Sequence, residues 1–241
     1  MYEVKKNRIV VYTALFGGYD NLIELTIDDA DVDFVCFTEN PELKSNSWNI
    51  VYVDKPFDDP VLCNRYYKMH PHLFFKDYDR SVYIDGNVRI LNSMYDLVQF
   101  NLAYDIIFAK HEHRNCLYDE AQVCISKKNT PEKLVDKQMS FYRNDGFPKD
   151  FGLGEMNIII RKHHSNEIIE LMDQWWEQFM LWAKRDQLSF FYLIWKNNIN
   201  FNYLHVNPRE KNDYFFIELH SNASKIKKIK RSLKRIIYTK L

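Results

Sequence analysis

The chain alternates between short apolar runs and longer stretches in which apolar residues recur at helical spacing. Runs rich in β-branched and aromatic residues predict strands at residues 8–14, 33–38, 48–53, 81–84, 105–109 and 156–161. These runs are nearly continuously apolar, as expected of strands that are covered on both faces. The amphipathic stretches predict helices at 60–75, at 130–142 and from 165 to about 182. Such alternation indicates an α/β domain with a mainly parallel central sheet flanked by helices.

Polar residues and prolines mark the ends of the predicted helices. Pro71 is expected to interrupt or end the first helix, since proline lacks the N–H that a helix interior needs. Thr130 is expected to cap the second helix, with Pro131 in its first turn. Ser165 is expected to cap the third. Asp186 is positioned either to cap a further apolar helix or to act together with its polar neighbours.

Composition narrows the class of protein. With 241 residues, 46% of them hydrophobic, the chain can bury one sizeable core but is short for two ordinary domains. Basic and acidic residues number 33 each, yet eight bases lie within residues 225–241, where no acid occurs. Residues 1–224 therefore carry a net charge of −8. An acidic body argues against a nucleic-acid-binding domain, and six glycines and seven prolines in so aromatic a chain exclude disordered and fibrous classes.

The sequence carries no evident targeting or disulfide signal. Its apolar runs are shorter than the roughly 20 residues of a membrane span, and its start lacks a long apolar region with a cleavage site. We therefore expect a cytoplasmic protein. The cysteines lack the close paired spacing of zinc sites and are expected to be reduced thiols in or near the core: Cys36, Cys63, Cys116 and Cys124.

The basic C-terminal tail, residues 221–241, forms a second segment beside the domain of residues 1–220. Apolar residues fall at helical spacing among its eight bases: Ile226, Ile229, Leu233, Ile236 and Ile237. This pattern predicts an amphipathic basic helix that lies on an anionic membrane surface, which would place the protein peripherally on the inner face of the membrane. Packing of the tail on its own acidic domain is the alternative.

Candidate chemistry is concentrated where predicted strands end, which is where α/β sheets bind ligands. Asp85, Gly86 and Asn87 follow the strand at 81–84 and offer a carboxylate and an amide oxygen to a hard cation such as Mg²⁺ or Mn²⁺. An ordinary Asp-Gly turn is the alternative. Arg65 and Lys68, three residues apart on the preceding helix, suit either a diphosphate or a solvated basic surface.

A second polar group follows the strand at 105–109. It combines imidazole, guanidinium, phenol and carboxylate groups between Lys110 and Glu120. Zinc binding is disfavoured because the third ligand has no defined spacing and the HExxH motif is absent. The mixture of hydrogen-bond donors and acceptors is better matched to sugar hydroxyls.

Seven strings together resemble a family of glycosyltransferase-like proteins, once classed as a domain of unknown function, with bacterial members and plant members linked to cell-wall polysaccharides. They are VYTALFGGYD at 11–20, DFVCFTEN at 33–40, RYYKMHPHLFF at 65–75, YDRSVYIDGNV at 78–88, HEHRNCLYDEA at 111–121, GLGEMNIIIRKHH at 152–164 and RDQLSFFYLIW at 185–195. The resemblance implies a GT-A fold, a Rossmann-like sheet that binds a nucleotide sugar. The layout is also similar to family 8 glycosyltransferases.

The resemblance implies a divalent cation, Mn²⁺ or Mg²⁺, as cofactor. Asp85 would be the metal carboxylate, and Asn87 would replace the second acid of the usual DxD motif. By analogy with family 8, a late histidine would complete the metal shell, for which His220 is the first candidate and His205 the second.

It further implies a set of residues for the substrates. The nucleotide would be lined by Thr13, Phe16, Gly17 and Tyr19, and the diphosphate would lie near Arg65, Lys68 and Gly86. Contacts to donor or acceptor sugar would come from His111, Arg114, Glu120, Glu155, Asn157, Asp186 and Gln187.

The function expected from this resemblance is glycosyl transfer from a nucleotide sugar to a glycan or a lipid-linked acceptor, with no role for nucleic acid. Inversion would require a carboxylate base, Asp186 or Glu155, whereas the family 8 analogy favours retention. One alternative is a non-catalytic module that binds nucleotide sugar or glycan on the same fold. A nucleotidyltransferase is the other, but its Gly-rich phosphate loop and second acid are missing from the sequence.

Overall fold

The structure is a computed structural model that describes residues 8–128 and 130–220. Its main sheet has seven strands in the order β3-β2-β1-β4-β7-β6-β8. Their bounds are β1 Ile9–Leu15, β2 Val32–Thr38, β3 Asn49–Tyr52, β4 Arg80–Ile84, β6 Ile106–Lys110, β7 Gly154–Arg161 and β8 Phe201–Tyr203. Within the described residues, β7 alone runs antiparallel to its neighbours in this sheet. The expected α/β class with a mainly parallel sheet is confirmed.

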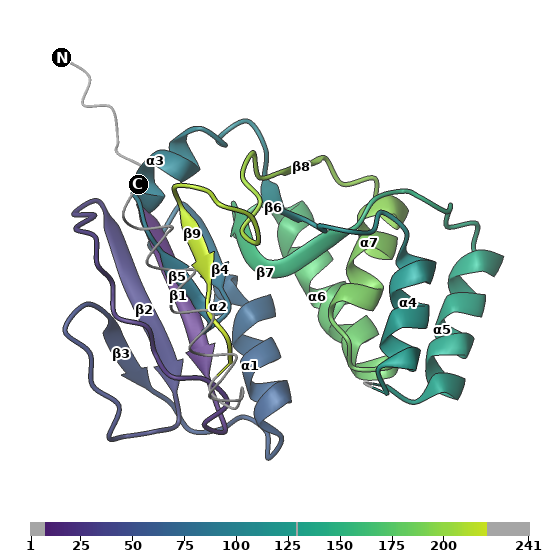
Figure 1. The fold of residues 1–241 in the computed structure, drawn as a ribbon, viewed down its shortest axis with the longest axis horizontal. Helices are drawn as coiled ribbons and strands as arrows, with labels where there is room; N and C mark the ends of the chain where they lie inside the picture. The colour runs from purple at the N-terminus through teal and green to yellow at the C-terminus, as the bar shows by residue number, and fades with distance from the viewer. Residues whose placement is uncertain (1–7, 129, 221–241) are drawn as a thin grey trace.

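Helices cover this sheet, and their bounds are α1 Pro60–Met69, α2 Pro71–Phe74, α3 Met94–Gln99, α4 Leu117–Ser126, α5 Glu132–Asn144, α6 Asn166–Leu181 and α7 Gln187–Lys196. Figure 1 shows β1–β3 at one end of the molecule and α4–α7 at the other, with β7 between them. Alternate residues of β1 enter two different cores, Val10 and Tyr12 on one face and Ile9 and Val11 on the other. The inner strands of the sheet are therefore buried on both faces, as their continuous apolar sequence predicted.

The predicted helix ends are confirmed with one exception. The helix at 60–75 breaks before Pro71, and Ser165 caps α6 by accepting a hydrogen bond from the Ile168 amide. The prediction that Thr130 caps the second helix is wrong. That helix begins at Glu132, and its first backbone hydrogen bonds run to the carbonyl of Pro131, so Thr130 lies one residue too early to act as the cap. All four cysteines are free and buried, as expected.

A second, two-stranded sheet joins distant parts of the chain beside the turn at Asp85. Its strands are β5 Val88–Ile90 and β9 Phe215–Ile217, which pair antiparallel. At their end, the Glu218 amide donates to the Asn87 carbonyl at 2.8 Å, and the Asn87 side-chain nitrogen donates to the Glu218 carbonyl at 3.0 Å. The chain near residue 218 is thereby fixed to the turn.

The tail at 221–241 lies outside the described residues, so its amphipathic character stays a prediction. Across residues 8–128 and 130–220, no helix has both the length and the apolar character to cross a membrane.

Stability is expected to fall at acid pH because of His163, which lies two residues after the end of β7. The ring is buried and its Nε2 lies 3.0 Å from the Phe75 carbonyl. Burial, with the nearby charges of His164 and Arg161, lowers the pKa of His163 from 6.5 to about 4. The unfolded chain therefore binds this proton at higher pH than the folded protein does, and stability is lost as the pH falls from 6.5 toward 4.

Thermal melting between pH 7 and pH 4.5 should show this loss as a fall of several degrees, and the fall should be smaller in His163→Gln. The matched control is His113→Gln, because the His113 side chain is 68% exposed. Equal pH dependence in both variants would contradict the assignment.

Candidate active site

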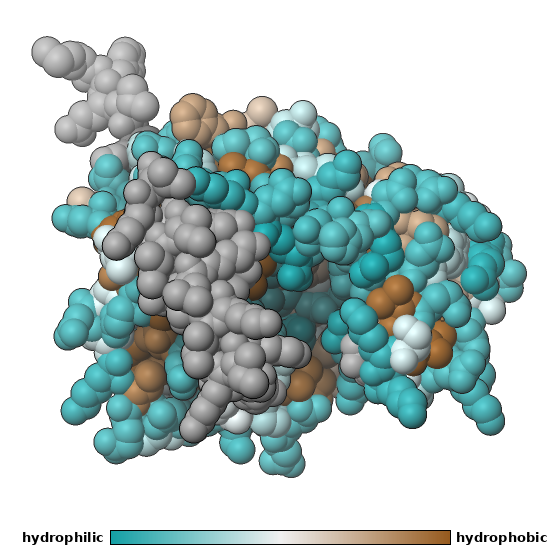
Figure 2. Space-filling view, in the orientation of Figure 1, coloured by the Kyte–Doolittle hydropathy of each residue, from teal (hydrophilic) through white to brown (hydrophobic). Residues whose placement is uncertain are grey.

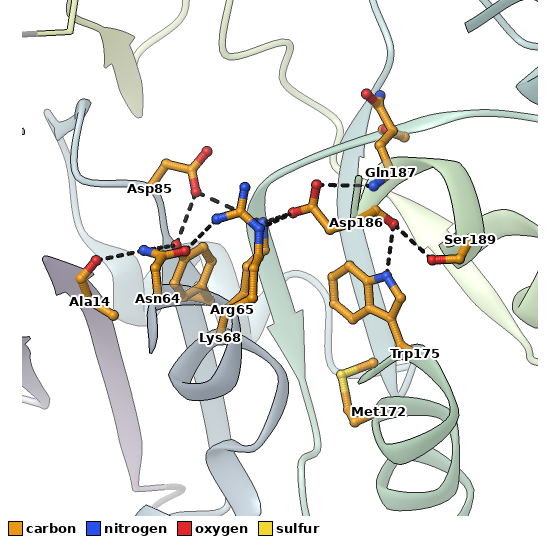
Figure 3. A network of polar contacts seen from close by, with 12 residues as sticks. Ala14, Asn64, Arg65, Lys68, Asp85, Met172, Trp175, Asp186, Gln187 and Ser189 are labelled. Atoms are coloured by element: carbon orange, nitrogen blue, oxygen red, sulfur yellow. Dashed lines mark hydrogen bonds and ion pairs between the residues drawn. The ribbon is translucent and has the colours of Figure 1, made fainter. Parts of the chain in front are cut away.

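Asp85 lies at the carboxyl end of β4, beside the end of β1. Its amide donates to the Asn157 carbonyl of β7 at 2.9 Å, and its Oδ1 accepts a hydrogen bond from the Tyr83 hydroxyl at 3.0 Å. Asn64 of α1 donates to the Ala14 carbonyl at 2.6 Å and so joins the end of β1 to the same place (Figure 3). The Tyr83 hydroxyl therefore fixes one carboxylate oxygen of Asp85, while the side chain remains 33% exposed to solvent.

Lys68 lies between Asp85 and a second carboxylate, Asp186. Its Nζ donates to Asp186 Oδ2 at 2.7 Å and lies 3.9 Å from Asp85 Oδ1. The side chain is only 1% exposed, and its Nζ is 5.0 Å from the centre of the Tyr83 ring. Arg65, one helical turn earlier, places Nε 2.9 Å from the same oxygen of Asp186. The interpretation of these two cations as a solvated surface is therefore wrong, because they form a buried cluster with carboxylates.

The two carboxylate oxygens of Asp186 make different interactions, one with the start of α7 and one with the two cations of α1. Its Oδ1 accepts the Gln187 amide hydrogen and caps α7, while its Oδ2 contacts Lys68 and Arg65 (Figure 3). Its backbone carbonyl accepts a hydrogen bond from the Trp175 indole at 2.8 Å. Burial alone would raise the pKa of this carboxyl, but the charges of Arg65 and Lys68 outweigh it and hold the pKa well below its usual range. Such a carboxylate is a weak base.

The end of α1 that carries Lys68 is fixed by a fully buried arginine, Arg161. One Nη group donates to the Tyr12 hydroxyl at 2.6 Å and to the Lys68 carbonyl at 2.8 Å. The other lies 2.9 Å from the Met172 sulfur of α6. Since Tyr12 also donates to the Lys68 carbonyl, β1, β7 and α6 together hold Lys68 in place.

Asn157 lies opposite Asp85 on the neighbouring strand β7, and Glu155 is two residues earlier on that strand. Glu155 is 7% exposed and accepts hydrogen bonds from Asn157 Nδ2 at 3.2 Å and from Arg209 Nε at 2.5 and 2.7 Å. Arg209 was not found from the sequence, because it lies in an irregular loop with no strand or helix pattern to place it.

The group that follows β6 contains a second buried ion pair. Arg114 Nε donates to Glu120 Oε2 at 2.7 Å, and Glu120 is 5% exposed. His111 accepts the backbone hydrogens of His113 and Arg114 on Nδ1 and places Nε2 3.7 Å from Glu120. Burial, with the charge of Arg114, lowers the pKa of His111. His111 is therefore neutral at pH 7, with one ring nitrogen committed to the backbone.

Close packing of the Gly86 turn brings a third group beside Asp85. A Cβ on Gly86 would collide with the Leu15 side chain and lie 3.4 Å from the Asp20 Cβ. Asp20 contacts His220, whose Nδ1 lies 2.9 Å from a carboxylate oxygen, and the His220 ring lies 4.9 Å from that of Tyr19. Sequence reasoning found Tyr19 and His220 but not Asp20.

The other predicted metal ligands have partners of their own. The Asn87 nitrogen donates to Glu218, which leaves its amide oxygen as the atom that can face a cation. His205 packs against Phe100 and Tyr214. In the described part of the chain, His, Cys, Asp and Glu form no group of three or more that is arranged to hold a metal ion.

Comparison with known proteins identifies the family. The family model described as TOD1/MUCI70, glycosyltransferase-like domain, matches residues 1–218. The chain belongs to this family. No curated protein matches it. Among solved structures, the apo form of mouse xyloside xylosyltransferase 1 is similar with 12% sequence identity and a TM-score of 0.45, over 82% of this chain and 84% of that one.

The remaining predicted residues of this TOD1/MUCI70 domain line the end of β1 and the start of α7. Thr13 is buried, and Phe16 packs in the core with its ring 5.4 Å from that of Tyr67. Gly17 adopts a φ of +68°, which favours glycine, and its amide donates to Glu39 at 2.6 Å. The Gln187 side chain donates to the Gly154 carbonyl at 2.8 Å, across from Asp186. In the orientation of Figure 1, the space-filling view in Figure 2 shows a hollow in the middle of the molecule, surrounded mostly by hydrophilic residues.

Proposed function

We propose that this TOD1/MUCI70 domain transfers a glycosyl group from a nucleotide sugar to a glycan or lipid-linked saccharide, in the synthesis of cell-surface polysaccharide. The observation that carries the proposal is the convergence of Lys68 and Arg65 beside Asp85, at the carboxyl edge of the sheet. Breaking a sugar–phosphate bond develops negative charge on the departing diphosphate, and fixed cations in a water-poor site stabilise that charge. Membership of a glycosyltransferase-like family supports the same class of reaction.

A divalent cation, Mn²⁺ or Mg²⁺, is part of the proposal. Its ligands would be the partly exposed carboxylate of Asp85, the amide oxygen of Asn87 and the His220 ring. His220 lies near the turn because it contacts Asp20, which packs against Gly86. Hard oxygen donors suit these ions, and substrate phosphates and water fill the remaining positions. When bound, the ion would supply Lewis-acid stabilisation of the leaving diphosphate.

The polar groups beyond Asp85 are proposed to orient the sugars. His111, Arg114 and Glu120 form one hydrogen-bonding group, while Glu155, Asn157 and Gln187 lie along β7 and the start of α7. They provide both donors and acceptors, which sugar hydroxyls require. The nucleotide would lie along Thr13, Phe16, Gly17 and Tyr19 at the end of β1.

Retention of configuration is the stereochemistry that we favour. The two carboxylates considered as bases are both paired with cations, Asp186 with Lys68 and Arg65, and Glu155 with Arg209. The low pKa of Asp186 makes it a weak base. Retention does not need a carboxylate base at the position that inversion requires.

A screen of nucleotide sugars by thermal shift, with Mn²⁺ and with EDTA, tests donor binding and the need for metal together. The expected result is a rise in melting temperature with one class of donor, followed by release of the nucleoside diphosphate when an acceptor is added. Saturable binding without turnover over a broad panel of donors and acceptors would instead identify a non-catalytic binding module.

The basic tail is proposed to hold the protein on the inner face of an anionic membrane. Each base near such a surface contributes about 1 kcal/mol, and the tail has eight. Full-length protein should therefore co-sediment with anionic vesicles more strongly than a version that ends at Asn222. Equal binding of the two would end this part of the proposal.

A further inference from the structure

The loop between β8 and β9 connects the edge of the main sheet to the small sheet beside Asp85. At one end, the Leu204 amide donates to the Phe108 carbonyl of β6 at 3.0 Å. At the other end, the Leu91 amide, just after β5, donates to the Tyr214 carbonyl at 2.8 Å. The connection, residues 204–214, therefore runs from the β6 edge back to the turn that carries Asp85, as Figure 1 shows between β8 and β9.

Two asparagines give this loop its shape. Asn207 Oδ1 accepts the Arg209 amide hydrogen at 3.0 Å. Asn212 donates to the carbonyls of Asn207 and Glu210 at 2.9 and 3.0 Å, and its Oδ1 accepts the Tyr214 amide hydrogen at 2.9 Å. The backbone at Arg209 is thus held by short-range hydrogen bonds that do not involve its side chain.

The Arg209 side chain extends from this loop onto β7. Its Nε donates to both carboxylate oxygens of Glu155, which is buried on a central strand. Between residues 8 and 220, leaving out residue 129, the hydrogen bonds of this side chain to protein all come from Nε. Since the Arg209 side chain is 46% exposed, its two Nη groups are available to a ligand in solution.

Three carboxylates, Asp85 among them, act on the charge of Arg209. Burial alone would lower the pKa of Arg209, but the carboxylates of Glu155, Glu112 and Asp85 outweigh it and raise the pKa. Lys68 and Arg65 approach Asp85 from α1, whereas Glu155 and Arg209 approach from β7 and the loop. Contacts on β7 join Arg209 to Asp85: the Asp85 amide donates to the Asn157 carbonyl, the Asn157 side chain donates to Glu155, and Glu155 accepts from Arg209.

We propose that Arg209 is a third cation of the diphosphate site, binding phosphate oxygens of the ligand through its Nη groups while Glu155 fixes the guanidinium. This inference rests on the proposed function and assigns that site a residue from the C-terminal loop. A planar guanidinium suits phosphate because it offers paired N–H donors in a fixed geometry. The loop then contributes directly to ligand binding.

Calorimetric titration of inorganic pyrophosphate into the full chain, with Mg²⁺ and with EDTA, tests this role. Arg209→Gln should weaken binding about tenfold, the cost of one charge-assisted contact of about 1.4 kcal/mol. The matched control is Lys211→Gln, which removes the same charge from an exposed position of the same loop and should change affinity less than twofold. Circular dichroism and melting curves would check that each variant is folded.

Glu155→Gln separates ligand binding from a purely structural contact. If Arg209 only fastens the loop to β7, both substitutions break the same ion pair and should shift affinity alike. A phosphate-binding Arg209 predicts different effects, because Glu155→Gln keeps an oxygen that can accept the Arg209 Nε hydrogen and removes a charge that repels the anion, so this variant should not weaken binding. Equal weakening in both variants, or an unchanged affinity in Arg209→Gln, would overturn the proposal.

Arg65→Gln makes failure of this inference distinguishable from failure of the proposed function. If the wild-type chain binds no pyrophosphate in either buffer, the diphosphate site itself is wrong. If the wild type binds and Arg65→Gln weakens it while Arg209→Gln does not, the site stands and only the role of Arg209 is rejected.

Discussion

Replacing Asp85 by alanine is expected to reduce glycosyl transfer by a factor of about 10²–10³, the usual cost of removing one group that stabilises developing charge. The substitution removes the exposed carboxylate proposed to hold the divalent cation and leaves Lys68 with Asp186 as its one close carboxylate. Turnover should be measured as release of nucleoside diphosphate in the presence of acceptor and Mn²⁺, with the donor found in the thermal-shift screen.

The matched control for this variant is Asp58→Ala, which removes an exposed carboxylate from the segment before α1. The control should retain wild-type turnover. Asp85→Ala should melt within a few degrees of the wild type, because its carboxylate is partly solvated and loses one hydrogen bond, from Tyr83. Undiminished turnover in Asp85→Ala would reject the metal role and, with it, the proposed centre of the site.

Asp186→Asn is expected to lower the free energy of unfolding by about 3–5 kcal/mol, because it removes the closest carboxylate from two cations in a buried place and leaves them only the partly exposed Asp85, 3.9 Å from Lys68. The Lys68 side chain is 1% exposed and that of Asp186 is 9% exposed. Asparagine has nearly the same size as aspartate and keeps an oxygen that can cap α7. The loss of stability would therefore come from the missing charge and not from a cavity. Urea unfolding followed by circular dichroism measures this difference, and activity should fall as well because Lys68 and Arg65 lose the group that orients them.

An exposed ion pair of the same length provides the control. Asp145 contacts Lys196 at 2.7 Å, and that lysine is 48% exposed, so Asp145→Asn should cost much less stability. The double variant Lys68→Met, Asp186→Asn should recover part of the lost stability, since an apolar replacement removes the unpaired charge, but it should recover no activity. Equal losses in Asp186→Asn and Asp145→Asn would show that the buried cluster is not an important source of stability.

Much of the fold was predictable because each buried strand appears in the sequence as a short apolar run, which can be recognised without knowing its partners. β1 was expected at 8–14 and lies at Ile9–Leu15, and the break at Pro71 follows from the chemistry of proline alone. The antiparallel direction of β7 was not predictable, since an apolar run specifies a covered strand but not its orientation. The three-residue strands β5 and β9 are too short to show a pattern.

The candidate site was predictable only where a motif and a strand end coincide, as at Asp85. The partners Lys68 and Asp186 are separated by 118 positions in the chain, and nothing local in the sequence indicates their contact. Arg209 was missed for the same reason, because its place depends on a loop between two sheets. Capping was one of the two roles expected of Asp186, and the structure shows it for Oδ1, whereas Oδ2 is explained by the ion pairs.

The pairing of β5 with β9 has a practical consequence for experiments on this protein. It places residue 218 next to the turn at Asp85, whereas residue 8 precedes β1 at the opposite, amino end of the parallel strands. A purification tag or fluorescent fusion added soon after residue 220 would therefore emerge beside the entrance for substrates. Labels attached before residue 8 would leave that entrance open, and shortened versions need to extend through Glu218 to keep the turn in place.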